Sequence, residues 1–174
     1  EYDHIKEHSH FTKLMLEKIN FTRQLQDVPS IASSHHEKID GSGYPSGLRS
    51  EEIPKLGKIL AIVDVFDALT SRRHYRDRMD FKKVMQVIAD GSGSQFDEFY
   101  VAAFKKIRMD RLVLILEYEN QDKLEYEQLA PLKLFDMQSF LVIEDKNNLD
   151  KEHQWTKDLF YFFYSRDYLN GAMD

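Results

Sequence analysis

Apolar residues recur at helical spacing over the amino-terminal part of the chain. In the segment 3–19, Ile5, His8, Phe11 and Met15 fall on one face, and this spacing predicts a helix. Further helix signals follow: a proline suited to a first turn, aspartates suited to N-caps and a glycine suited to a helix end. These signals predict helices at 29–37, 54–71, 80–91 and 97–107.

The predicted helix 54–71 is apolar on nearly every side, which is typical of a helix at the centre of a domain. Asp64 lies among these apolar residues. A lone buried carboxylate is costly and requires a cation or strong hydrogen-bond donors. We therefore interpret Asp64 as a metal ligand supported by Asp67. The alternative is a structural hydrogen bond or an arginine partner.

The pattern changes after residue 108. Strands are predicted at 111–118, 124–127 and 140–143, followed by an aromatic-rich helix at 151–169. The expected fold is mainly α: a helical domain over 1–108, followed by a small mixed α/β module over 109–174. The aromatic run at 159–164 is more often core than interface, although it could also cover the helical domain or form a homodimer contact.

Composition narrows the function classes. The chain has 174 residues, 42 % of them hydrophobic, which is enough for a sizeable core. Its net charge of -6 argues against non-specific nucleic-acid binding, so an anionic substrate must meet a local basic cluster or a metal ion. Without cysteine the chain has no disulfide, zinc ribbon or thiol nucleophile, which suits a reducing cytoplasm.

Histidines are the candidate metal ligands. His35 and His36 are adjacent, and neighbours on a helix point about 100° apart. They would therefore serve a two-ion cluster, or one would bind a metal while the other binds phosphate; two ordinary polar histidines at a helix end are the alternative. His8 lies on an apolar face, where a satisfied core histidine is the commoner outcome. From the residues alone, His4 and His10 stay open as well.

Two further segments fit a phosphate ester. The loop that contains Gly43 and Tyr44 allows close backbone approach to a phosphate, and the tyrosine offers a flat face for a base. The basic run at 72–78 includes Arg73 and Arg76, whose guanidinium groups match phosphate oxygens. The alternatives are a plain turn and a solvated basic surface.

In order and spacing these motifs resemble the HD-GYP family, a branch of the HD phosphohydrolases. The resemblance covers about residues 1–107. It rests on Ile5-Lys6-Glu7-His8, His35-His36-Glu37, Asp40-Gly41-Ser42-Gly43-Tyr44-Pro45, the segment 59–71, Arg73-x-Tyr75-Arg76 and Phe96-Asp97.

The resemblance implies a metal-dependent phosphodiesterase that hydrolyses the bacterial second messenger cyclic di-GMP to pGpG or GMP. It implies two or three divalent ions, iron or manganese first and zinc as a further option, held by His8, His35, His36 and Asp64. Asp64 and His36 would be the catalytic residues among these ligands. The substrate contacts would come from Gly43, Tyr44, Arg73 and Arg76. The same loop is linked in the family to docking of diguanylate cyclase (GGDEF) proteins.

The chain departs from the family pattern in one respect. The family's His-Asp pair and the lysine after it precede the segment that matches Glu1, so we expect the chain to be the carboxy-terminal part of an HD-GYP domain. The alternative function is a catalytically inactive cyclic di-GMP receptor or a docking module. His74 and Glu98, which stand where the family commonly has proline, are tolerable differences.

Overall fold

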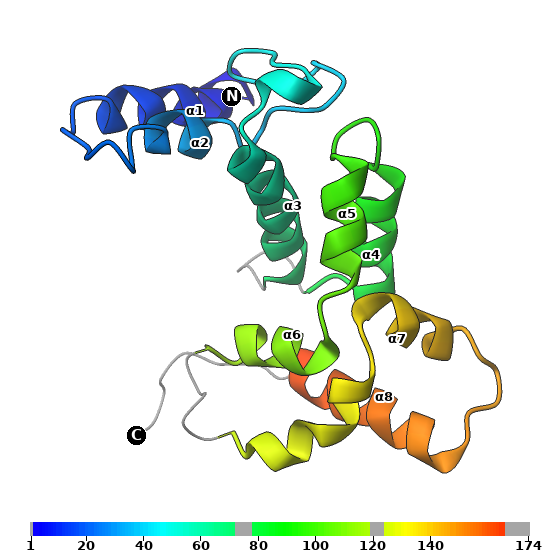
Figure 1. Ribbon diagram of the computed structural model, residues 1–174. Coiled ribbons are helices and arrows are strands. Elements are labelled where there is room, and N and C mark those ends of the chain that lie inside the picture. Colours follow the sequence, from blue (N-terminus) through cyan, green and yellow to red (C-terminus); the bar gives the residue numbers. More distant parts are fainter. Residues whose placement is uncertain (1, 72–77, 119–123, 166–174) are drawn as a thin grey trace. The chain divides into compact units, whose positions relative to one another are not determined.

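The computed structural model describes residues 2–71, 78–118 and 124–165 of the chain. Within these ranges the secondary structure is helical and contains no strand. The chain divides into two compact units, Glu1–Ala102 and Ala103–Asp174 (Figure 1). The predicted fold class, mainly α, is confirmed.

The helices of the first unit begin and end close to the predicted signals. Pro29 lies in the first turn of its helix, Asp80 caps another by accepting a hydrogen bond from Lys83 N (3.2 Å), and Gly91 follows that helix directly. The elements are α1 Tyr2–Leu16, α2 Val28–Ser33, η1 Ser50–Glu52, α3 Lys55–Thr70, α4 Phe81–Asp90 and α5 Glu98–Lys105, the last of which continues past the division after Ala102. One difference matters for the site: α2 ends at Ser33, although a helix through 37 was predicted.

The core of the first unit is built on α4 and one side of α3. Phe81, Val84 and Ile88 of α4 have no exposed surface, and Ile62 of α3 is 1 % exposed. Apolar residues on another side of α3 reach the surface: Leu56, Ile59, Leu60 and Val63. The helix predicted to be central thus buries one side in the part of the chain that the structure describes, and its apolar character on the other side does not correspond to burial there.

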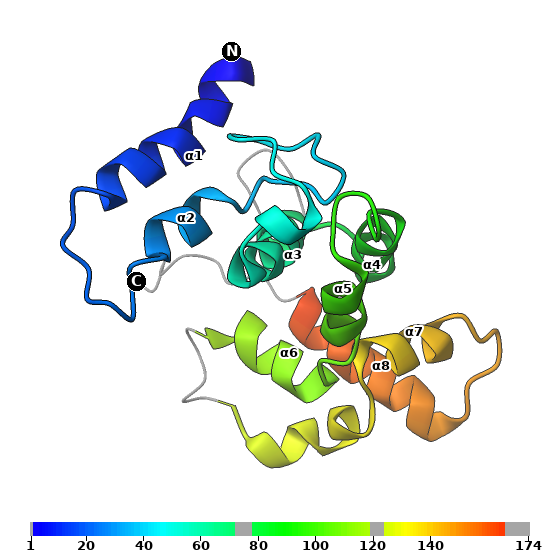
Figure 2. The same ribbon diagram turned by 45° about the horizontal axis from the view of Figure 1, so that its top comes forward.

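Close packing fixes α3 against the region that follows α2. A Cβ placed on Gly57 would collide with Ser34 Oγ, so a larger residue here would have to displace the Ser34 side chain. Nearby on α3, the Lys58 ammonium forms a 2.9 Å ion pair with Asp97, and the lysine side chain is only 7 % exposed. α1 lies beside α2 in both views (Figures 1 and 2). Helix α2 thus contacts both α1 and α3.

The second unit is helical, which corrects the prediction of a mixed α/β module. Helices replace the strands predicted at 111–118 and 140–143, and the third predicted strand, 124–127, leads into a 3-10 helix that begins at Tyr126. The elements are α6 Met109–Leu116, η3 Tyr126–Leu134, α7 Met137–Glu144 and α8 Lys151–Tyr164. A short apolar run fits a strand and a half-buried helix equally well.

The pattern of burial in α6 follows the repeat of a helix and not the alternation of a strand. Met109, Leu112 and Val113 are at most 1 % exposed, whereas Ile115 is 63 % exposed, as expected for a helix with one buried face. Helix α7 starts at a true N-cap, because Asp136 accepts a 2.7 Å hydrogen bond from Ser139 N.

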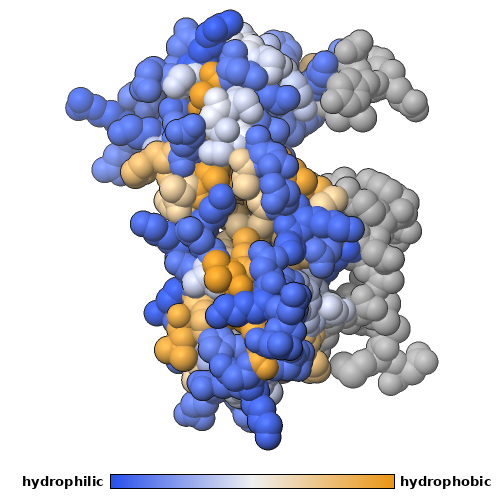
Figure 3. Space-filling model, turned by 90° about the vertical axis from the view of Figure 1, so that its right-hand side faces the viewer, coloured by the Kyte–Doolittle hydropathy of each residue, from blue (hydrophilic) through white to orange (hydrophobic). Residues whose placement is uncertain are grey.

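Aromatic residues of α8 fill the core of this unit. Phe160 is fully buried and packs against Phe140 of α7, with ring centroids 4.9 Å apart. Other apolar side chains lie at the surface, Trp155 and Phe162 among them, and apolar patches interrupt the hydrophilic surface in Figure 3. Among the described residues, no helix combines the length and the apolar character that a membrane span requires.

Candidate metal centre

The early end of α2 decides how the adjacent histidines are presented. His35 and His36 lie in a turn after Ser33, closed by a hydrogen bond from Glu37 N to Ser34 O (3.0 Å). The turn lies outside α2, and the two rings lie close together, with centroids 4.0 Å apart. The angular argument from a helix therefore does not apply to this pair.

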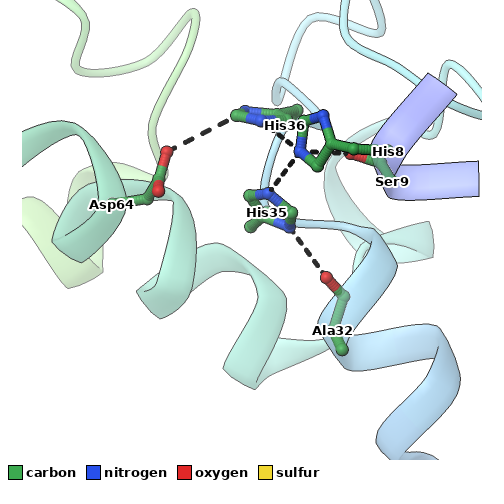
Figure 4. A network of polar contacts seen from close by, with 6 residues as sticks. All are labelled: His8, Ser9, Ala32, His35, His36 and Asp64. Atoms are coloured by element: carbon green, nitrogen blue, oxygen red, sulfur yellow. Dashed lines mark hydrogen bonds and ion pairs between the residues drawn. The ribbon is translucent and has the colours of Figure 1, made fainter. Parts of the chain in front are cut away.

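His8 of α1 completes a cluster with this pair. Its Nε2 lies 3.3 Å from His35 Nε2 and 3.1 Å from His36 Nε2 (Figure 4). One nitrogen from each of the three rings lies within 4.8 Å of the others, an arrangement that could hold a metal ion. The fold thus brings together residues that are 27 and 28 positions apart in the sequence.

The donor set fits a divalent transition metal. Metal–nitrogen bonds of about 2.0–2.1 Å place neighbouring ligand nitrogens roughly 3.0–3.4 Å apart, and the two distances to His8 Nε2 fall in that range. His35 Nδ1 lies 2.7 Å from the Ala32 carbonyl oxygen, which can only accept a hydrogen bond. Nδ1 therefore carries the proton, and the Nε2 lone pair faces the cluster.

The electrostatics of His36 also favour a neutral ligand. Its pKa is lowered from 6.5 to about 4, first because the ring is partly buried and then because His35 and His8 lie beside it, while Asp64 acts in the opposite direction. At neutral pH the imidazole is therefore uncharged, as metal coordination requires.

Asp64 extends toward the cluster from α3. Its Oδ2 lies 4.0 Å from His36 Nδ1, at the other edge of the ring from the Nε2 that faces His8 (Figure 4). Its side chain is 47 % exposed, so the argument from a buried carboxylate was wrong, because α3 presents this side of the helix to solvent. Proximity to His36 is what supports a role for Asp64. Asp67 instead accepts a 3.1 Å hydrogen bond from Ser71 Oγ.

The glycine loop packs directly on the histidine turn. Tyr44 N donates to His36 O (3.1 Å), and the Tyr44 ring lies beside the His36 ring, tilted by 36° with centroids 4.7 Å apart. The Lys6 ammonium lies 5.8 Å from the centroid of the same tyrosine ring. A Cβ on Gly43 would lie 2.6 Å from His36 O, so this position requires glycine. Tyr44 thus forms part of the rim of the cluster.

Other sequence candidates lie elsewhere. Arg73 and Arg76 are outside the described residues, as is the side chain of His4. His10 is exposed and contacts Phe11, with ring centroids 6.2 Å apart. His8 is therefore the histidine of α1 that the described structure places in the cluster.

Sequence reasoning missed the role of Glu37. Its side chain is 3 % exposed, and its two carboxylate oxygens accept hydrogen bonds from Ser46 N (2.7 Å) and Leu48 N (2.9 Å). Directly after two histidines, a glutamate gives no signal in the sequence that distinguishes a metal ligand from an acceptor for a distant loop.

Comparison with protein families agrees with this geometry. A family model described as HD domain matches residues 1–99, which include the three clustered histidines. The chain belongs to the HD domain family. Its motifs and its relatives assign it to the HD-GYP branch, as the sequence predicted.

Relatives of this HD domain include named phosphodiesterases. A probable cyclic di-GMP phosphodiesterase of Vibrio cholerae is 38 % identical over 109 residues, 60 % of this chain and 25 % of the relative. A cyclic di-GMP phosphodiesterase of Thermotoga maritima is 37 % identical over 110 residues, 63 % of this chain and 30 % of the relative. A 3'3'-cGAMP-specific phosphodiesterase of Vibrio cholerae is 32 % identical over 106 residues, 61 % of this chain and 22 % of the relative. The chain thus spans less than a third of each of these relatives.

Acidification is expected to destabilise the metal-free HD domain through His36. With a pKa of about 4 when folded and about 6.5 when unfolded, His36 binds a proton more readily in the unfolded chain. The free energy of unfolding should therefore fall as the pH drops from 6.5 toward 4. Because the side chain is 25 % exposed, we expect a loss of about 1–2 kcal/mol by pH 5.

Urea unfolding in the presence of a chelator, at pH 7 and pH 5, measures this loss. His36→Asn should unfold with a smaller difference between the two pH values. Equal differences in the variant and the unaltered protein would show that His36 does not carry the effect.

Proposed function

We propose that this HD domain serves a metal-dependent phosphodiesterase that hydrolyses cyclic di-GMP to pGpG or GMP in bacterial signal transduction. The observation that carries the proposal is the convergence of His8, His35 and His36 on one point, with Asp64 beside them. Three imidazoles and a carboxylate are a donor set suited to iron, manganese or zinc. Relatives named cyclic di-GMP phosphodiesterases support the substrate class.

The proposed ligands of two or three divalent ions are His8, His35, His36 and Asp64, with iron or manganese preferred. When bound, such ions supply Lewis-acid stabilisation of charge on phosphate oxygens and lower the pKa of bound water. The histidines contribute neutral nitrogens in a fixed arrangement. Asp64, 4.0 Å from His36 Nδ1, is close enough to orient that ring or to hold an ion with a small side-chain movement.

The Tyr44 loop is proposed to hold the substrate. Tyr44 offers an aromatic face beside the cluster, on which a guanine could stack, and a hydroxyl donor. The Lys6 ammonium, 5.8 Å from the centroid of the same ring, is proposed to attract a substrate phosphate. Arg73 and Arg76 are proposed to contact a phosphate or a guanine edge from the segment that follows α3. These contacts would position the phosphodiester at the metal centre.

We propose that residues 1–108 carry these functions and that 109–174 form a separate helical module. GGDEF proteins are proposed partners at the Tyr44 loop, and a homodimer is a further proposal. A second substrate candidate is 3'3'-cGAMP, because the chain is also similar to a phosphodiesterase specific for that dinucleotide.

Turnover of the full-length protein, purified without oxygen, tests this function. With cyclic di-GMP as substrate we expect release of linear product and about two or more ions per chain by elemental analysis. The kcat/KM should exceed that for 3'3'-cGAMP by about tenfold or more, because the two differ in the base edge that the site must recognise.

Two other outcomes of this experiment would change the proposed function. Faster hydrolysis of 3'3'-cGAMP would reassign the substrate. Ligand binding without metal and without product would overturn the phosphodiesterase in favour of a receptor or docking module.

A further inference from the structure

Glu37 combines deep burial with contacts to a loop some ten residues further along the chain. Its side chain is 3 % exposed, and each carboxylate oxygen accepts one backbone hydrogen bond, from Ser46 N at 2.7 Å and from Leu48 N at 2.9 Å. A carboxylate is stable at such burial only when strong donors replace its water. The two backbone amides supply those donors.

These two hydrogen bonds attach the later part of the loop 44–48 to the turn that carries His35 and His36. At the start of the loop, Tyr44 N donates to His36 O, and Gly43 lies against the backbone of the turn. At its later part, the Glu37 carboxylate accepts hydrogen bonds from the amides of Ser46 and Leu48. Glu37 directly follows His36 in the chain, so the turn that carries two proposed metal ligands also fixes both ends of the segment 44–48.

The ring of Tyr44 belongs to the segment that these bonds attach. Its centroid lies 4.7 Å from that of the His36 ring and 5.8 Å from the Lys6 ammonium. A loop held only at Tyr44 N could rotate about that single hydrogen bond, whereas two further bonds at 46 and 48 restrict it. The carboxylate that restricts this segment makes its hydrogen bonds to the backbone at 46 and 48.

We propose that Glu37 is a positioning residue for the substrate-binding loop and is not a metal ligand. Both of its oxygens are engaged by amides, and it is absent from the group of side chains that converge on a common point in the described structure. By holding segment 44–48 on the histidine turn, Glu37 fixes Tyr44 beside the metal centre. The consequence for catalysis rests on the proposed function; the consequence for the loop does not.

Glu37→Gln is the sharpest variant, because it keeps the size of the side chain but replaces one acceptor by an NH₂ group that faces an N–H donor. We expect hydrogen exchange at the amides of Ser46 and Leu48 to accelerate about tenfold or more. We also expect kcat/KM for cyclic di-GMP to fall about 10–100-fold, mainly through KM, with unchanged metal content.

Two control variants accompany this change. Glu37→Asp, which keeps two acceptors, should restore part of both the exchange protection and kcat/KM. Glu51→Gln, the same change at an exposed glutamate of the same region, should alter neither.

A double-mutant cycle with Tyr44→Ala separates positioning from general loss of structure. If Glu37 acts through Tyr44, Glu37→Gln should lower kcat/KM by less than about twofold in the Tyr44→Ala background. A full additive loss in that background would overturn the proposal, as would loss of bound metal in Glu37→Gln or unchanged exchange at 46 and 48. If the unaltered protein hydrolyses no cyclic dinucleotide, the proposed function fails, and the exchange measurement still decides whether Glu37 holds the loop.

Discussion

Replacing His36 by alanine is expected to abolish hydrolysis of cyclic di-GMP, with a loss of about 10³-fold or more in kcat. His36 occupies the middle of the site: its Nε2 lies 3.1 Å from His8 Nε2, its Nδ1 lies 4.0 Å from Asp64 Oδ2, and its ring contacts that of Tyr44 with centroids 4.7 Å apart. Removal of the ring takes away a metal ligand, the partner of the carboxylate and the platform of the tyrosine together. Such coupled groups lose function as a unit.

Turnover assays and elemental analysis on the same preparation measure the two effects. We expect the metal content of His36→Ala to fall by about one ion per chain or more, because a site with two remaining imidazoles is poorly closed. His10→Ala is the matched control, since His10 is an exposed histidine of α1 that contacts Phe11. Full turnover and full metal occupancy in His36→Ala would remove His36 from the ligand set.

The second large effect is expected for Gly43→Ala. A Cβ at this position would lie 2.5 Å from Glu37 Cα and 2.6 Å from His36 O, and would also collide with Lys38 N. All of these atoms belong to the backbone, so the added methyl group must displace either the loop or the turn that carries His36. We expect about 1–3 kcal/mol of lost stability. A displacement of about 1 Å at the site should lower kcat/KM about 100-fold.

Thermal unfolding and steady-state kinetics measure these two losses. Gly93→Ala is an informative control, because Gly93 lies outside the loop 44–48 and has a positive φ of 81°, while the nearest atom to an added Cβ is the side-chain Oε1 of Glu98 at 2.8 Å. That variant should cost stability through backbone strain, about 1–2 kcal/mol, and should lower kcat/KM far less than Gly43→Ala. Equal effects of the two variants on kcat/KM would mean that the close approach of Gly43 to the histidine turn does not account for the loss of activity.

Local signals in the sequence were sufficient for most of the first unit. A proline in the first turn and an N-cap aspartate act within one helical turn, so Pro29 and Asp80 mark helix starts. Gly91 follows the end of α4 with a right-handed φ of -78°, where a Cβ would collide with the Phe96 ring. Local signals were also sufficient for the identity of the site residues, since the order and spacing of the histidine pair and the Gly43-Tyr44-Pro45 loop carry the family resemblance.

The spacing of apolar residues gave the wrong secondary structure where a helix and a strand are compatible with the same pattern. The apolar run at 112–116 is nearly continuous and fits a buried strand, but α6 buries Leu112 and Val113 against neighbouring helices and exposes Ile115. The decision came from packing partners far along the chain, η3 and α8. No window of a few residues contains that information.

Tertiary structure alone decided the geometry of the site. The end of α2 at Ser33 placed His35 and His36 in a turn, where their rings converge with that of His8. Packing of α3 left Asp64 exposed at 47 %, although every neighbour in the sequence suggested burial. The sequence determined which groups are present, because residue types and short-range caps are local. The fold determined which atoms meet, because contacts across 27 or more positions depend on how whole helices pack.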